Sequence, residues 1–170
     1  HEGPGTLVTH GLGPEYTWPE QGSPRVITGV TQVLNMAQLV IETPPEAAKK
    51  TDLVIFETLA AAGISVDLIN VYPDRKAFII REEQVDRAVE LLREAGFEPQ
   101  VRRGCAKVSV VGMGMRGVPG VMANVVKALT EAEIEILQTA DSHVTISCLI
   151  DQEQVRPALR ALLKQFRLEA

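Results

Sequence analysis

The chain has 170 residues, of which 45% are hydrophobic and 4% aromatic, and its formal net charge is −5. That length can hold one medium-sized domain or two small ones with a buried core. Because aromatic residues are scarce and the basic residues are scattered among acids, neither a base-stacking surface nor a phosphate-binding stripe is indicated, which disfavours nucleic-acid binding.

The first 24 residues are rich in Gly and Pro and show no helical or strand period beyond a short run at 5–9. Such a composition is typical of a linker. The β-branched runs and amphipathic segments begin at Arg25, where the ordered part is expected to start. The chain begins at His1 instead of Met, which suggests that it is part of a larger protein.

A repeat with a period of seventy residues organises the rest of the chain. Residues 62–69 (AGISVDLI) are matched by residues 132–139 (AEIEILQT), each at the end of a helical pattern. Both units are predicted to run strand, helix, strand, strand, helix. In the first unit the elements are expected at 37–43, 51–62, 64–71, 77–81 and 83–95. In the second unit they are expected at 106–112, 121–132, 134–140, 144–150 and 151–166.

The helices are predicted from apolar residues that recur every three or four positions. Gly63 and Gly96 follow two of these patterns directly, where a left-handed residue is favoured. Pro157 conflicts with a helix that begins at Asp151, because it removes a backbone hydrogen bond in the second turn. That helix is expected to begin later or to kink.

The fourth strand of each unit decides how the units are connected. The first unit has one at 98–103, but the second ends at its helix, and the VITGVT run at 26–31 is a spare β-rich segment. We therefore predict an α+β fold of two ferredoxin-like βαββαβ units, with antiparallel sheets and helices on one face. The first unit, 37–103, is inserted in the second, which combines 25–33 with 104–170. They are called the inserted unit and the split unit below.

The Gly-rich segment that precedes the first helix of the split unit is a candidate binding loop. Its glycines allow close backbone approach, and a helix N-terminus offers free N–H groups to a carboxylate. Alternatively, the glycines only form the turn and the proline starts the helix. No Gly-Lys-Ser/Thr ending is present, so nucleotide binding is not expected. The candidate residues are Met115, Arg116, Gly117, Val118, Pro119, Gly120 and Val121.

A polar cluster ends the second strand of the split unit and is the other candidate. Its carboxylate and hydroxyls could bind an amine, or the cluster could form the hairpin through Asx-type turns. His143 cannot complete a nucleophilic triad with its neighbours, because adjacent strand residues point to opposite faces. The cluster is Gln138, Thr139, Ala140, Asp141 and Ser142, and the matching turn of the inserted unit has Asn70, Tyr72 and Asp74.

The two cysteines, Cys105 and Cys148, lie in apolar runs without CxxC spacing or a neighbouring histidine cluster. Metal binding is not expected, and buried free thiols of a cytoplasmic protein are favoured over a disulfide. The sequence has no apolar run of ~20 residues and no signal segment, so neither membrane insertion nor export is indicated.

The most distinctive segments are GCAKVSVVG at 104–112, GVPGV at 117–121 and ILQTADSHVTISC at 136–148. Together they resemble the paired ACT domains at the C-terminus of aspartokinases, over residues 25–168. Within that family the resemblance is strongest to the diaminopimelate-sensitive Gram-positive type.

This resemblance implies a regulatory region that binds a pathway-end amino acid, either diaminopimelate, lysine or threonine, and gives feedback control of aspartate phosphorylation. It also implies a homodimer formed through the ACT units. A kinase domain of the same protein, using ATP and Mg, would precede residues 1–24. The fragment itself is expected to have neither catalytic residues nor a cofactor.

In the family, effectors bind where an ACT unit of one subunit faces the other type of unit in its partner. The resemblance places these sites at 115–121 with 70–74, and at 43–51 with 138–142. The inserted unit departs from the family pattern, because TPPEAAKK at 43–50 replaces an Asp-x-Pro-Gly turn. The Gly-rich loop of the split unit is therefore ranked first.

Other classes of function remain open at this stage. An acylphosphatase-like hydrolase would need a loop arginine beside an asparagine that positions water, and Arg116 and Asn124 are candidates. The ACT pair could also serve dimerisation alone, without a ligand. An RNA-binding module of the same topology would carry aromatic residues on its central strands and is disfavoured. Those positions hold Val108, Val110, Ile146 and Cys148.

Overall fold

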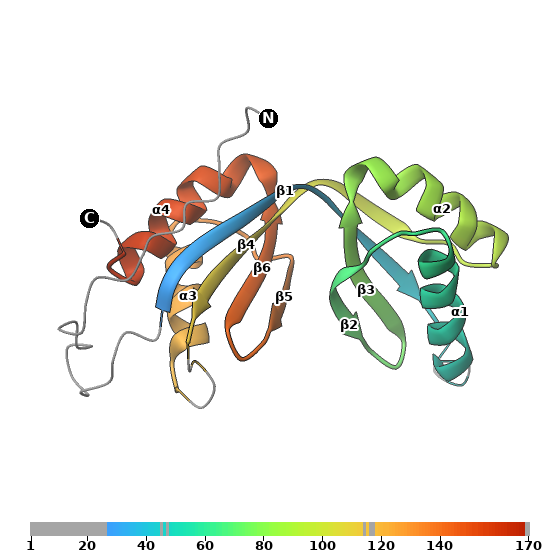
Figure 1. Cartoon of the computed structure of the whole chain (residues 1–170), viewed down its shortest axis with the longest axis horizontal. Helices are drawn as coiled ribbons and strands as arrows, with labels where there is room; N and C mark the ends of the chain where they lie inside the picture. Colours follow the sequence, from blue (N-terminus) through green and yellow to red (C-terminus); the bar gives the residue numbers. More distant parts are fainter. Residues whose placement is uncertain (1–26, 45, 47, 114, 116–117, 169–170) are drawn as a thin grey trace. The chain divides into compact units, whose positions relative to one another are not determined.

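The computed structural model describes residues 27–168, apart from 45, 47, 114, 116 and 117 (Figure 1). The predicted linker at 1–24 lies outside the described residues. The described chain divides into two compact units, one of residues 34–106 and one that combines 27–33 with 107–168. These are the inserted unit and the split unit, and each is described by itself.

Two long strands, β1 (Ile27–Glu42) and β4 (Gln100–Gly112), run through both units. The sequence predicted a break in each of them, at 32–36 and at 104–105, and this prediction was wrong. Asn35 and Gly104 adopt left-handed backbone angles, with φ of 56° and 67°. A single left-handed residue interrupts the apolar alternation without ending the strand.

The strand order is β2-β3-β1-β4-β6-β5, with β1 and β4 shared between the units. The inserted unit therefore has the order β2-β3-β1-β4, and the split unit has the order β1-β4-β6-β5. Both are the arrangement of a βαββαβ sandwich, with the fourth strand of the split unit supplied by the start of β1. The predicted fold class, two ferredoxin-like units with the first inserted in the second, is confirmed.

The inserted unit contains α1 (Ala48–Ala61), β2 (Asp67–Val71), β3 (Arg75–Arg81) and α2 (Val85–Glu94). β3 pairs antiparallel with both β1 and β2. The two helices pack side by side on one face of the strands (Figure 1). Its core is aliphatic apart from one phenylalanine, and comprises Ala37, Leu39, Ile41, Ile55, Leu59, Ile64, Phe78, Ile80, Val85, Ala88 and Leu92.

The split unit contains α3 (Val121–Glu131), β5 (Gln138–Asp141), β6 (Thr145–Asp151) and α4 (Val155–Gln165). β5 and β6 form an antiparallel hairpin, and α3 packs beside α4. The four positions that an RNA-binding sheet would use for base stacking are aliphatic or cysteine and are all buried, which leaves no stacking platform on these strands. They are Val108, Val110, Ile146 and Cys148.

The starts of three helices differ from the prediction, and α1 begins at Ala48, three residues before the predicted 51. Short 3₁₀ turns, η2 (Glu82–Gln84) and η3 (Gln152–Gln154), precede α2 and α4, which therefore begin at Val85 and Val155. Pro157 consequently lies in the first turn of α4, where its missing N–H has no intrahelical partner to lose. The sequence conflict at this proline is resolved by a later start, without a break in the helix.

The predicted helix stops and the state of the cysteines agree with the structure. Gly63 and Gly96 have φ of 70° and 89°, and the Gly63 N–H donates to the carbonyl oxygen of Ala60 at 3.0 Å. Such left-handed endings are common at helix C-termini. Cys105 and Cys148 are both buried free thiols.

Candidate functional site

The two candidate segments of the split unit lie at the same end of its sheet. The Gly-rich loop follows β4, and the polar cluster ends β5 and forms the turn into β6. The N–H of Gly112, the last residue of β4, donates to the carbonyl oxygen of Val144 in that turn at 2.9 Å. This backbone contact joins the residue from which the loop starts to the turn that follows the polar cluster.

The described part of the Gly-rich loop leads into an open helix N-terminus. The Val118 N–H donates to the Met115 carbonyl at 3.1 Å, and the Met115 side chain is 6% exposed and anchors the loop. Gly120 is the N-cap of α3, with φ of 89°, and as a glycine it brings no side chain that could cap the helix. The first turn, which starts at Val121, carries no acidic residue. The N–H groups and the helix dipole at this end therefore suit an anion such as a carboxylate. The other predicted loop residues, Arg116 and Gly117, lie outside the described residues, while Pro119 is exposed.

The polar cluster divides into a strand part and a turn part. Gln138 is buried, Thr139 and Ala140 are half-buried, and Asp141 is exposed at the end of β5. The Ser142 hydroxyl accepts the N–H of Val144 at 3.3 Å and of Thr145 at 3.0 Å, and lies 2.9 Å from the Thr145 hydroxyl. Ser142 therefore organises the turn, whereas Asp141 presents a carboxylate that could receive an amine.

The matching residues of the inserted unit also lie at a turn. The Tyr72 N–H donates to the Arg75 carbonyl at 2.9 Å, and the Arg75 guanidinium lies 4.9 Å from the centre of the Tyr72 ring. The Asp74 carbonyl accepts the Thr43 N–H at 2.8 Å, which joins the end of β1 to the turn. Asn70 is half-buried at the end of β2.

The turn and loop of the inserted unit are held by Lys76, which the sequence analysis missed. Its side chain has 0% exposure, and its Nζ donates to the Tyr72 carbonyl at 2.7 Å and to the Thr43 hydroxyl at 3.2 Å. The same Nζ lies 3.1 Å from Asp52 Oδ1 in α1. The signal was present, because Lys76 is two residues before Phe78 and therefore on the same face of β3 as the apolar core.

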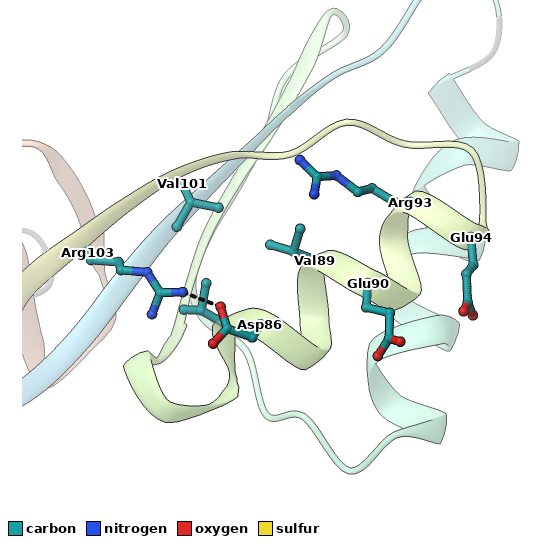
Figure 2. Close-up of a pocket in the computed structure, with 8 residues that line it drawn as sticks. Asp86, Val89, Glu90, Arg93, Glu94, Val101 and Arg103 are labelled. Carbon is teal, nitrogen blue, oxygen red and sulfur yellow. Dashed lines mark hydrogen bonds and ion pairs between the residues drawn. The ribbon is translucent and has the colours of Figure 1, made fainter.

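A groove on the inserted unit lies between α2 and β4 and has a volume of about 570 Å³ (Figure 2). Four of its five charged residues, all but Glu94, pair with one another or with neighbours, as in the ion pair between Arg103 and Asp86. Arg93 hydrogen-bonds Glu98 through its Nε at 3.0 Å, and this hydrogen bond holds the pKa of the Glu98 carboxyl below its usual range. None of the predicted site residues lines this groove.

Asn124, one of the two residues that the acylphosphatase-like alternative requires, is engaged in another contact. The Asn124 side-chain oxygen accepts the Gln165 amide at 3.0 Å, so it is tied to α4 within the helix layer. A residue that positions attacking water would need that oxygen to face a substrate. Within the described part of the chain, no group of three or more His, Cys, Asp or Glu side chains could hold a metal ion. None of the described helices is both long and apolar enough to cross a membrane.

The contacts described above lie within single units. The predicted pairing of site segments across units stays a prediction. That pairing joins 115–121 to 70–74, and 43–51 to 138–142, each time between different types of unit. The structure joins Gly112, at the end of β4, to Val144 in the split unit, and Thr43 to 72–76 in the inserted unit.

Comparison with known proteins identifies the fold family. Residues 100–164 match the model of the ACT domain. The fold and this match define the chain as a protein with a pair of ACT-type units, each a small α+β sandwich.

Known proteins similar to this chain include aspartokinases. The chain is 40% identical to Aspartokinase 1 of Bacillus subtilis over 145 residues, which is 85% of this chain and 35% of that protein. It is 33% identical to the regulatory subunit of aspartate kinase from Thermus thermophilus, solved in a ligand-free form, with a TM-score of 0.75. That match covers 83% of this chain and 99% of the Thermus chain. The chain belongs to the aspartokinase family and corresponds to its ACT-domain regulatory region. It spans about a third of the length of the Bacillus relative.

Proposed function

We propose that this chain senses a pathway-end amino acid and thereby gives feedback control of aspartate phosphorylation. The support is the combination of family membership and the open end of the split unit. There, an uncapped helix N-terminus and an exposed carboxylate, Asp141, lie on segments joined by the Gly112–Val144 hydrogen bond. A free amino acid carries a carboxylate for the helix N-terminus and an ammonium for Asp141.

The carboxylate of the effector binds, in this proposal, at the N-terminus of α3, and its ammonium binds at Asp141. Backbone N–H groups and the helix dipole stabilise an anion at the first position, and a charge-assisted hydrogen bond stabilises the cation at the second. The loop residues 115–121 shape the site, Thr139 and Ala140 flank it, and the turn at 70–74 of a partner subunit completes it.

The effector class follows from the sequence resemblance. Diaminopimelate, lysine and threonine share the α-carboxylate and the α-amine that this end would recognise, and the resemblance to the diaminopimelate-sensitive type ranks diaminopimelate first. A homodimer formed through the ACT units is part of the proposal, because a site shared between subunits lets a ligand favour one subunit arrangement over another.

The whole protein is proposed to be an aspartate kinase that transfers the γ-phosphate of ATP to the β-carboxylate of aspartate. ATP and Mg would bind to the catalytic part of that protein, which accounts for the remaining length of the relatives. The buried free thiols, Cys105 and Cys148, are typical of a reducing compartment, and we place the protein in the cytoplasm.

A calorimetric titration with meso-diaminopimelate, lysine and threonine, together with light scattering, tests this proposal. Saturable binding of one of them to a dimer is expected. Asp141→Asn should weaken it at least about tenfold, since a charge-assisted pair is lost, while the exposed Glu153→Gln serves as the matched control. A folded dimer that binds none of the three would favour the alternative in which the pair serves assembly alone.

A further inference from the structure

A fully buried ammonium lies at the end of the inserted unit that corresponds to the open end of the split unit. Among the described residues, Lys76 is the charged side chain in the buried set, with 0% exposure. A lysine is rarely buried in this way unless its charge is paired, because removing an ammonium from water costs several kcal/mol. Its surroundings must therefore replace water.

Three oxygens from three different segments replace water at this lysine. The Thr43 hydroxyl comes from the end of β1, the Tyr72 carbonyl comes from the turn after β2, and the Asp52 carboxylate comes from the second turn of α1. The distances from Nζ are 3.2, 2.7 and 3.1 Å. Nζ donates hydrogen bonds to the first two oxygens, whereas Asp52 Oδ1 contributes its charge through an ion pair without accepting a hydrogen bond. We call these three residues the ammonium cage.

The seventy-residue repeat shows what stands at the same place in the split unit. The 3₁₀ turns at 82–84 and 152–154 fix the register. In that register Lys76 corresponds to Ile146, Asp52 to Met122 and Thr43 to Met113. The split unit thus has an apolar side chain at the position of the lysine and methionines at the positions of Thr43 and Asp52, and of the cage oxygens it keeps the backbone carbonyl alone, at Ser142.

We infer that Lys76 occupies its end of the inserted unit in place of the amine of a free amino acid. The cage is a site for one primary ammonium, and the chain fills it with its own side chain. Because Lys76 ties the loop, the turn and α1 together without a ligand, the inserted unit is closed to effector, and the split unit carries the one responsive site of each chain. The regulatory meaning of this inference rests on the proposed function, whereas the existence of the ammonium cage does not depend on it.

Chemical rescue tests the cage directly. Lys76→Ala removes three carbons and the ammonium, which are the atoms of n-propylammonium. We expect thermal unfolding of Lys76→Ala to shift to lower temperature, and n-propylammonium chloride to raise its midpoint more than that of the unchanged chain. The neutral analogue n-propanol should not do so. Lys76→Met, which keeps the volume filled without the charge, should not respond to the amine either.

Two results would overturn the inference. An equal effect of n-propylammonium on Lys76→Ala, Lys76→Met and the unchanged chain would overturn the cage. If Lys76→Ala is unfolded alone, amine-dependent recovery of its circular dichroism is the expected result, and no recovery overturns the inference.

The number of effector molecules bound per chain, measured by calorimetry, tests the regulatory part of the inference. One effector bound per chain is expected, and two per chain would show that the inserted unit is open. If none of the amino acids binds, the proposed function fails, whereas the amine rescue still reports on the cage.

Discussion

The substitution Gly120→Ala isolates the backbone conformation at the start of α3. Gly120 has φ of 89°, in the left-handed region, and a Cβ built on it would meet nothing within 4 Å. The change therefore adds conformational strain without a steric clash. Placing an L-residue in this region costs about 1–2 kcal/mol, and replacing a glycine returns about 0.4–1 kcal/mol through the unfolded state.

The net expected loss in unfolding free energy is about 1 kcal/mol. Gly63→Ala provides the matched control, because Gly63 has φ of 70° and equally open surroundings but lies at the end of α1, away from the proposed site. Both variants should lose similar stability. Only Gly120→Ala should also weaken effector binding, since it changes the direction of the N–H groups at the start of α3.

Urea unfolding followed by circular dichroism measures the stability, and calorimetry measures the binding. No loss of stability in either variant would contradict the left-handed conformations. A loss far larger in Gly120→Ala than in Gly63→Ala would show that a Cβ at the loop is sterically excluded, which would refute the reasoning from open space.

Three further predictions concern other parts of the chain. Leu129 is fully buried and Thr130 is exposed, so Leu129→Ala should cost about 2–5 kcal/mol in urea unfolding and Thr130→Ala should change little. Burial raises the pKa of the Cys148 thiol from 9.0 to about 11, so its contribution to stability is present below the unfolded pKa and is lost as the pH rises toward about 11. A disulfide reagent should accordingly label Cys148 slowly in the native chain near neutral pH and rapidly in denaturant, and equal rates would contradict its burial. The Glu98 carboxyl should titrate by NMR below the usual range for glutamate, and high salt or Arg93→Gln should raise its pKa, because the cause is an exposed hydrogen-bonded pair.

Much of the architecture could be predicted from the sequence, because the same order of elements recurs in the two units of the repeat. The spare β-rich run at 26–31 and the missing last strand of the split unit were enough to predict the insertion. The continuity of β1 and β4 could not be predicted, because Asn35 and Gly104 look like turn residues, whereas their left-handed backbone angles occur within strands that continue. The starts of α2 and α4 were missed by two and four residues, since the polar residues of the turns Glu82–Gln84 and Gln152–Gln154 are also typical of a first helical turn.

The candidate site was readable in part. The alternatives at Ser142 could be separated only by seeing its hydroxyl accept two backbone N–H groups. Lys76 was missed because a lysine beside Arg75 resembles a solvent-exposed pair, and the strand was predicted to begin one residue later. Its burial depends on oxygens from residues 43, 52 and 72, which a local pattern cannot bring together.

The measurement that tests the central claim most directly is amide chemical-shift mapping of the chain with meso-diaminopimelate, lysine and threonine. We expect one of them to shift the amides at the start of α3 and in the turn at 141–145, together with those of the turn at 70–74 that completes the site from the partner subunit, with smaller changes at 43–52. Shifts at 43–52 without shifts at the start of α3 and at 141–145, or no shifts from any of the three, would contradict an effector site at the end of the split unit.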